Sequence, residues 1–116
     1  PLSEGVPHPR SYGTFPRVLG KFVREEKVLT LEEAIAKMSG RTADKFGIEG
    51  RGYIRQGNFA DIVVFNPDTV IDKATWSNPH TYPEGIGQVI VNGRIVVKDG
   101  EHTGELPGRI LKKTTV

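Results

Sequence analysis

The sequence contains no cysteine, and it has only one methionine and one tryptophan. A chain without cysteine forms no disulfide scaffold, no thiolate zinc site and no cysteine nucleophile. Long hydrophobic runs are also lacking, since apolar stretches such as residues 62–65 are far too short to span a bilayer. No signal-peptide pattern is visible in the first residues. We therefore expect a cytoplasmic protein with no membrane partner.

Positive charge is too evenly spread along the chain for nucleic-acid binding. The 116 residues include 16 Lys and Arg against 14 Asp and Glu, which leaves a formal net charge of +2. Because the two signs are interleaved, there is no dense basic stripe of the kind that binds nucleic acid by counterion release. We expect no nucleic-acid partner.

Composition and periodicity divide the chain into four zones. They are a loop rich in Pro, Gly and His, a helical zone, a β-rich zone and a polar tail, at residues 1–13, 14–47, 48–111 and 112–116. In the helical zone, Thr14 is a candidate N-cap, and apolar residues recur at helical spacing from Phe15 to Val23. Gly20 interrupts this pattern and indicates close packing against a neighbouring segment.

Two further short helices are predicted in the helical zone. Thr30 and Glu33 have the spacing of a capping box, in which the side chain of each residue binds the backbone N–H of the other. Gly40 is expected to end this helix, and Thr42 to begin another that ends before Gly47. Each helix is short and amphipathic, so each needs a surface to pack on.

The β-rich zone contains one clear hairpin. An Asn-Gly pair at 92–93 separates two apolar runs at 89–91 and 95–97, and a β-branched run at 62–65 predicts another strand. Since both hairpin runs are apolar at every position, both faces of the sheet need cover, which so few strands and small helices do not supply. The first residue, Pro1, is also not methionine. We therefore expect an α+β piece of a longer protein.

Few residues are candidates for catalysis or metal binding. The three histidines lie far apart, without the close pair that is typical of a zinc site: His8, His80 and His102. No Gly-x-Ser-x-Gly elbow is present to carry a serine nucleophile. We therefore predict neither a catalytic residue nor a metal ligand within the chain.

Three other features are interpreted as structural. Asp61 stands at the start of an apolar run, where a short carboxylate commonly binds backbone amides. The Gly-Arg-Gly sequence at 50–52 follows a predicted helix rather than a strand, which favours a tight turn over a phosphate-binding loop. Trp76 and Tyr82 lie in an irregular, Pro-rich segment and are expected to hold it against the rest of the domain.

The segment His8-Pro9-Arg10 contains the candidate binding group. The planar guanidinium of an arginine in an ordered loop can bind a carboxylate through two parallel hydrogen bonds. An ion pair between Arg10 and a neighbouring acidic side chain is the alternative.

One longer string resembles a known family. Residues 8–20 (HPRSYGTFPRVLG) are similar to the late part of D-aminoacylases, the N-acyl-D-amino-acid deacylases of the metal-dependent amidohydrolase superfamily. Later segments agree with this family in order, namely residues 31–42, 52–65 and 91–109. The string at 8–20 is the specific part, whereas the Ala-Asp-Ile-Val and Val-Asn-Gly motifs are shared widely among amidohydrolases.

The resemblance implies a fold and an activity that this chain contains only in part. The fold would be the last helices of a TIM-like barrel, followed by part of a small composite β-sandwich domain that both ends of the longer protein build. The activity would be zinc-dependent hydrolysis of the linear amide of N-acyl-D-amino acids to a carboxylate and a D-amino acid, with an Asp as general base. That Asp would lie just upstream of Pro1, and Glu4 does not take its place. The chain alone is therefore expected to bind no zinc and to be inactive.

The resemblance also implies contacts for this segment. Arg10 and His8 would lie near the mouth of the active site, on the loop after the last barrel strand, and would contact the substrate. The rest of the same polypeptide is the expected partner, and exposed strand edges are expected to pair with another copy. Two alternatives stay open, which are a dihydroorotase- or hydantoinase-like cyclic amidohydrolase and a stand-alone β-rich interaction module.

Overall fold

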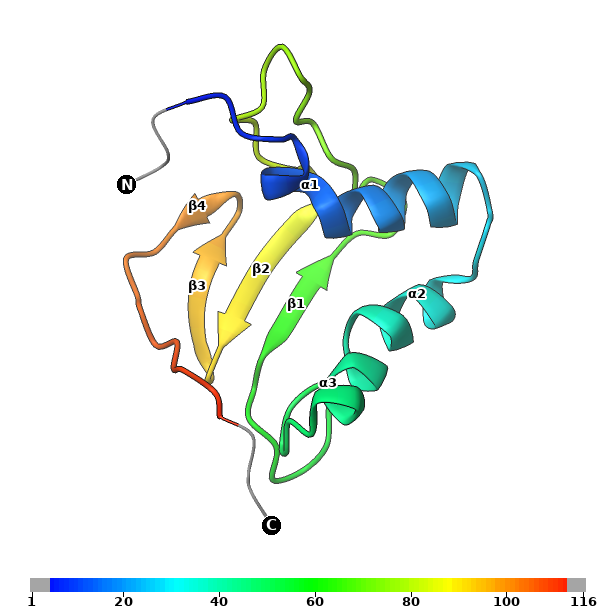
Figure 1. The fold of residues 1–116 in the computed structure, drawn as a ribbon. Helices are drawn as coiled ribbons and strands as arrows, with labels where there is room; N and C mark the ends of the chain where they lie inside the picture. The colour runs from blue at the N-terminus through cyan, green and yellow to red at the C-terminus, as the bar shows by residue number, and fades with distance from the viewer. Residues whose placement is uncertain (1–4, 113–116) are drawn as a thin grey trace.

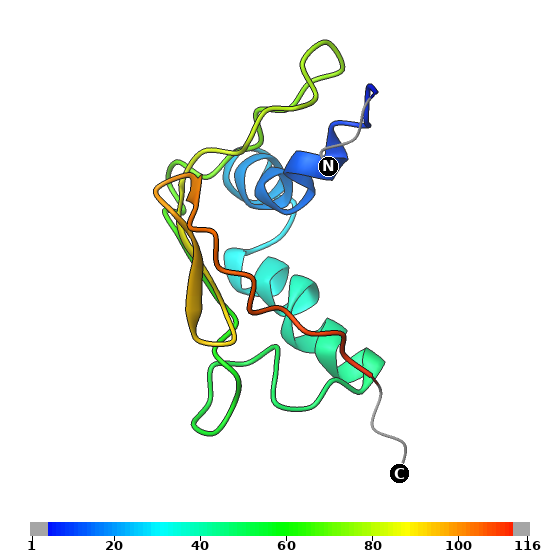
Figure 2. The ribbon, with the colours of Figure 1, turned by 90° about the vertical axis from the view of Figure 1, so that its left-hand side faces the viewer.

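Helices come first in the chain and strands second in the computed structural model, which describes residues 5–112. The elements are α1 (Arg10–Arg17), the π-helix η1 (Val18–Glu25), α2 (Leu31–Met38), α3 (Gly40–Phe46), β1 (Ile62–Phe65), β2 (Ile86–Val91), β3 (Arg94–Lys98) and β4 (Glu101–His102). Figure 1 and Figure 2 together show the helices on one side of the sheet, with the segment between β1 and β2 projecting past α1. The predicted α+β class is confirmed.

Across residues 5–112, every helix is too short or too polar to cross a membrane.

The sheet is antiparallel, and its strands lie in chain order, β1-β2-β3-β4. Val89 of β2 lies opposite Val63 of β1 on one side and Val97 of β3 on the other. The Asn-Gly turn at 92–93 joins β2 to β3, and both residues have positive φ, 48° and 79°. A type I′ turn requires this conformation. The predicted hairpin and the additional strand at 62–65 are therefore confirmed.

The described residues leave much of the sheet uncovered. Val63 and Val64 of β1 are 51% and 49% exposed, and every residue of β2 is only half-buried. Figure 2 shows why, since the helices stand on one side only. The apolar runs within these strands thus lack the two-sided cover that their sequence predicts.

A small core lies where η1 and α2 meet the sheet, at the end of β1 and the start of β2. Its buried members are Leu19, Ala34 and Val70, and Phe65 of β1 and Ile86 of β2 pack against them. Val70 lies just beyond β1 and is completely buried. Because α2 is an eight-residue helix, this contact rather than its own propensity is what stabilises it.

One face of the α1–η1 helix packs closely on the segment after β1. The residues on this face recur at intervals of four and three: Gly13, Arg17, Gly20 and Arg24. A Cβ atom on Gly13 would lie 2.7 Å from the Cβ of Asp72, and one on Gly20 would lie 2.5 Å from the carbonyl oxygen of Val70. Arg17 forms an ion pair with Asp72 at 3.2 Å. The close packing predicted at Gly20 is confirmed.

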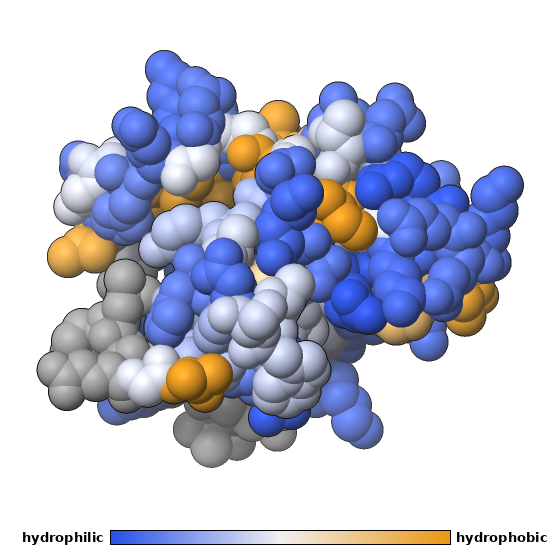
Figure 3. Space-filling view, turned by 90° about the horizontal axis from the view of Figure 1, so that it is seen from above, coloured by the Kyte–Doolittle hydropathy of each residue, from blue (hydrophilic) through white to orange (hydrophobic). Residues whose placement is uncertain are grey.

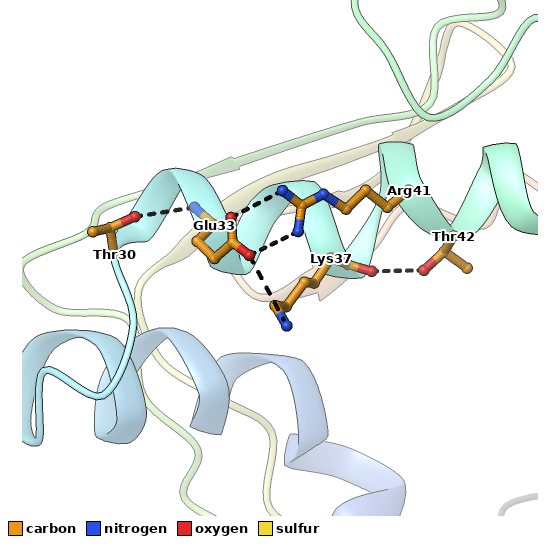
Figure 4. Close-up of polar contacts among 5 residues, drawn as sticks. All are labelled: Thr30, Glu33, Lys37, Arg41 and Thr42. Carbon is orange, nitrogen blue, oxygen red and sulfur yellow. Dashed lines mark hydrogen bonds and ion pairs between the residues drawn. The ribbon is translucent and has the colours of Figure 1, made fainter.

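Polar side chains connect α2 to α3 (Figure 4). The Thr30 hydroxyl accepts a hydrogen bond from the Glu33 backbone N–H at 3.2 Å, which confirms one half of the predicted capping box. The Glu33 carboxylate reaches forward instead and binds the Arg41 guanidinium at 2.7 and 3.1 Å, with Lys37 at 4.0 Å. The Thr42 hydroxyl donates to the Lys37 carbonyl at 2.6 Å. The second half of the predicted capping box, a bond from the Glu33 side chain back to the Thr30 N–H, is therefore wrong. The carboxylate binds Arg41 instead because a guanidinium is a stronger partner for it than a neutral amide.

The first helix begins earlier than predicted. It starts at Arg10, so residues 10–13 are helical and the prediction of a loop through residue 13 is wrong there. The preceding Pro9 already has helical backbone angles, φ −51° and ψ −27°. Thr14 lies inside the helix, and its hydroxyl donates to the Arg10 carbonyl at 2.7 Å. A threonine hydroxyl can make this bond inside a helix as well as cap one, so the residue type alone does not fix the boundary. Residues 1–4 of the predicted loop and 113–116 of the predicted tail lie outside the described residues.

The break between α2 and α3 also differs from the prediction. Ser39 interrupts the helical backbone with φ −127° and ψ −87°, whereas Gly40 is the first residue of α3. The ring of Tyr53 lies 2.6 Å from the position that a Cβ atom on Gly40 would occupy. Gly40 is therefore explained by this close contact and not by the end of a helix. The predicted end of α3 before Gly47 is confirmed, since Gly47 has left-handed backbone angles.

Candidate functional site

Arg10 occupies the first position of α1, and its side chain is exposed. Its backbone N–H donates to Nδ1 of His8 at 3.0 Å. Among residues 5–112, we find no acidic side chain paired with its guanidinium, so the alternative of an internal ion pair has no partner in the described part of the chain. An exposed guanidinium has the paired N–H donors that bind a carboxylate.

His8 is engaged in local contacts on the same turn. Besides binding the Arg10 N–H through Nδ1, it accepts a hydrogen bond from the Ser11 N–H on its carbonyl oxygen at 2.9 Å. Its ring meets Trp76 edge-on, with 4.5 Å between ring centroids. These contacts order the start of α1 and leave only Nε2 of His8 to face a ligand.

Five aromatic rings join the start of α1 to the segment between β1 and β2. This aromatic cluster consists of His8, Tyr12, Trp76, His80 and Tyr82. The Tyr12 ring lies edge-on to His80 and to Tyr82, at centroid distances of 5.5 and 5.6 Å. The Trp76 ring contacts His8 before α1, and the Tyr82 ring contacts Tyr12 of α1. The contacts predicted for Trp76 and Tyr82 are thus present, but the two side chains remain 70% and 62% exposed. Figure 3 shows this side of the molecule, where hydrophilic surface surrounds separate apolar patches.

Within the aromatic cluster, the His80 ring has a hydrogen-bond partner on each nitrogen. Nε2 lies 3.1 Å from the carbonyl oxygen of Gly5, and Nδ1 lies 3.0 Å from the hydroxyl of Tyr12. A carbonyl oxygen can only accept, so Nε2 donates, which leaves Nδ1 to accept from the Tyr12 hydroxyl. The sequence analysis missed this role, because the partners lie 75 and 68 residues away and leave no local signal.

A second polar group connects the 50–52 turn to the sheet. The Arg51 guanidinium binds the Asp61 carboxylate and donates to Asn92 Oδ1 at 2.8 Å, and it stacks on the Phe59 ring. The Asn92 N–H donates to Asp61 Oδ1 at 2.8 Å, which confirms the structural role predicted for Asp61. Partial burial raises the pKa of the Asp61 carboxyl, but the Asn92 amide and the Arg51 guanidinium together hold it below its ordinary value.

The described residues do not form a metal site. Within residues 5–112, no three His, Cys, Asp or Glu side chains converge in a way that could hold an ion. The histidines serve other contacts, since Nδ1 of His102 accepts a hydrogen bond from Gly104 at 2.9 Å, in addition to the bonds of His8 and His80. Their chemistry and spacing do not fit a zinc centre.

The chain is similar to known proteins over most of its length. The profile of the "Amidohydrolase family" matches residues 1–97. The D-aminoacylase of Alcaligenes xylosoxydans xylosoxydans is 49% identical over 108 residues, which cover 93% of this chain and 22% of that protein. The N-acyl-D-aspartate deacylase of the same organism is 52% identical over 106 residues, covering 90% of this chain and 21% of that protein. The chain thus spans about a fifth of the length of the curated relatives it matches.

Solved structures agree with the sequence comparison. The N-acyl-D-glutamate deacylase from Bordetella bronchiseptica, solved with zinc and a phosphonate inhibitor, superposes with a TM-score of 0.79 at 48% identity. The match covers 83% of this chain and 20% of that structure. A dihydroorotase from Lactobacillus gasseri is also similar, at 44% identity, but over only 74% of the chain. The resemblance to D-amino-acid deacylases expected from residues 8–20 is confirmed.

Proposed function

The chain belongs to the amidohydrolase family, and from this premise we propose that it is the C-terminal part of a zinc-dependent deacylase. The longer enzyme would hydrolyse the linear amide of N-acyl-D-amino acids to a carboxylate and a D-amino acid. The observation that carries this proposal is the likeness to D-amino-acid deacylases over nine-tenths of the chain or more. The dihydroorotase alternative has a likeness over a smaller part.

We assign the zones of the chain to parts of such an enzyme. Residues 1–13 would follow the last strand of a TIM-like barrel, with their helical end from Arg10, and residues 14–47 would be helices of the barrel's end. Residues 48–111 would form part of a small β-sandwich domain. The half-covered sheet supports this assignment, because a sandwich needs a second sheet or further strands against its apolar faces.

The zinc site and the catalytic Asp would lie in another part of the longer protein. The described residues supply no cluster of ligands for the metal. We therefore propose that the 116-residue chain alone releases no amino acid from N-acyl-D-amino acids, with or without zinc. Its contribution is to bind and orient the substrate.

Arg10 is the residue proposed to do this. Its guanidinium is exposed on the first turn of α1, while its backbone is held by His8. The α-carboxylate of an N-acyl-amino acid has the planar, two-oxygen geometry that a guanidinium binds through paired hydrogen bonds. We place His8 beside it as a second contact through Nε2.

The test is hydrolysis by the longer protein that contains this chain. N-acetyl-D-amino acids, their L-enantiomers and dihydroorotate are incubated separately with the zinc-loaded enzyme, and products are separated by chiral chromatography. We expect release of D-amino acids only. Opening of dihydroorotate without D-amino acid release would favour the cyclic amidohydrolase, and inertness toward all three would favour an interaction module.

We also propose that the chain associates with a second copy when it stands alone. Among the described strands, β1 and β4 form the edges of the sheet, and an open edge is a template for another strand. The exposed side chains of Val63 and Val64 lie on the β1 edge. Light scattering at rising concentration should show a mass above that of the monomer, and Val63→Lys should reduce it. A strictly monomeric chain at every concentration would contradict this.

A further inference from the structure

We propose that His80 is a positioning residue for Arg10. The inference rests on the proposed function, in which Arg10 binds the substrate carboxylate. His80 lies on the irregular segment between β1 and β2, and its ring binds the chain on both sides of Arg10. It is proposed to act through this segment, without touching the substrate.

The two hydrogen bonds of His80 span the segment that carries Arg10. Nε2 donates to the carbonyl of Gly5, five residues before Arg10, at 3.1 Å. Nδ1 accepts from the hydroxyl of Tyr12, two residues after Arg10, at 3.0 Å. One ring thus fixes a point in the approach to α1 and a side chain on its first turn.

The approach to α1 needs such a fixed point, because it has no regular structure of its own. Gly5 has φ 135°, a conformation that other residues rarely adopt, and Pro9 lacks the N–H that could bind a capping group. The N-cap position has no side-chain hydrogen bond either. His8 and Pro9 bind the backbone of residues 10–12 at the start of α1. Beyond these local bonds, the described hydrogen bonds and ring contacts of residues 5–9 are the Gly5–His80 bond and the packing of His8 on Trp76.

Farther along α1, the helix is already secured by other contacts. Gly13 packs on Asp72, and Arg17 pairs with the same residue. The His80 ring therefore governs only the first turn and the residues before it. A misplacement of a substrate-binding group by about 1 Å can lower the efficiency of an enzyme substantially, so a restraint at this turn affects binding.

The experiment uses the zinc-loaded longer enzyme with three substitutions at or near this position. His80→Phe removes both hydrogen bonds while keeping a ring against Tyr12. His80→Gln keeps one donor and one acceptor, since the amide N–H₂ can bind the Gly5 carbonyl and Oε1 the Tyr12 hydroxyl. His102→Phe is the matched control, because the described hydrogen bond of the His102 side chain is a local one to Gly104.

We expect His80→Phe to raise KM for an N-acetyl-D-amino acid about tenfold, since two hydrogen bonds that order the binding group are lost. The value of kcat should change by less than about twofold. His80→Gln should restore most of the loss, and His102→Phe should behave as the wild type. In an Arg10→Ala background, or with a substrate whose carboxylate is replaced by a carboxamide, His80→Phe should no longer raise KM. An equal effect of His80→Phe with and without Arg10 would overturn the proposal.

A structural readout separates this inference from the proposed function. Hydrogen exchange followed by mass spectrometry should show faster exchange of peptides covering residues 5–12 in His80→Phe and unchanged exchange in His102→Phe. Unchanged exchange in His80→Phe would overturn the positioning role even if the enzyme is an active deacylase. If the wild type hydrolyses no N-acyl-D-amino acid, the proposed function and the role of His80 toward a substrate both fall, whatever the exchange shows.

Discussion

The guanidinium of Arg24 donates a hydrogen bond of 2.7 Å to the carbonyl oxygen of Val70, whose side chain is completely buried. The same nitrogen donates to the carbonyl of Pro67 at 3.0 Å. Both carbonyls belong to the segment after β1, and neither accepts a backbone N–H among the described hydrogen bonds. A charged side chain from η1 thus satisfies backbone acceptors at the edge of the core.

Replacing Arg24 by methionine should lower the free energy of unfolding by about 1–3 kcal/mol, because the partly buried Val70 carbonyl loses its donor. Urea denaturation followed by circular dichroism measures the change. Arg94→Met is the matched control. Arg94 pairs with Glu105 at 3.1 Å, but both side chains are exposed, so its loss should cost less than about 1 kcal/mol. Equal losses in the two variants would contradict the role assigned to Arg24.

Gly20→Ala should also destabilise the chain. The added Cβ would lie 2.5 Å from the Val70 carbonyl oxygen and from Cδ1 of Ile71, and the helix would have to move away from the segment after β1. We expect a loss of about 1–3 kcal/mol, in spite of the higher helix propensity of alanine. Gly108→Ala is the control, since open space surrounds a Cβ atom there. A thermal-unfolding midpoint that rises in Gly20→Ala would refute the close packing.

The Asp61 carboxylate should make stability depend on pH in the acid range. Its pKa is lower in the folded chain than in the unfolded one, so the unfolded state binds more protons as the pH falls. The stabilisation is present above the unfolded pKa of about 3.9 and is lost as the pH drops through this value toward the folded pKa. Urea denaturation between neutral and acid pH should show a steeper fall for the wild type than for Asp61→Asn.

The hydrogen bond with Arg41 lowers the pKa of Glu33. Glu33 therefore contributes to the acid transition of the wild type and of Asp61→Asn alike. The difference between wild type and Asp61→Asn therefore isolates Asp61. Arg51→Met should also reduce the slope, because the guanidinium that favours the charged carboxylate is removed. Identical pH slopes for the wild type and Asp61→Asn would rule out this linkage.

Arg10→Ala in the longer enzyme should lower kcat/KM for N-acyl-D-amino acids about a hundredfold, mainly through KM, since a paired, charged contact is lost. The kcat/KM of Arg10→Lys should lie between those of the wild type and Arg10→Ala, because an ammonium group cannot bind both carboxylate oxygens in the same plane. Stability should change little, as the Arg10 side chain is exposed. Arg55→Ala, at another exposed arginine, serves as the control and should keep wild-type kinetics. A normal KM in Arg10→Ala would remove Arg10 from the site.

The sequence by itself determined the features whose causes are local. The Asn-Gly pair at 92–93 dictates the hairpin because these residues accept positive φ, and the run at 62–65 forms a strand because its β-branched side chains suit a pleated surface. Thr30 begins α2 by binding the N–H three residues on. The string at 8–20 was enough to point to the family.

Only the tertiary structure decided the features that join distant segments. It turned Glu33 toward Arg41 on the next helix, and it brought His80 to Tyr12 and Gly5. Helix caps and hairpin turns arise from contacts within a few residues, which a sequence pattern records. A hydrogen bond across 75 residues depends on how the whole chain packs, and no local pattern carries that information.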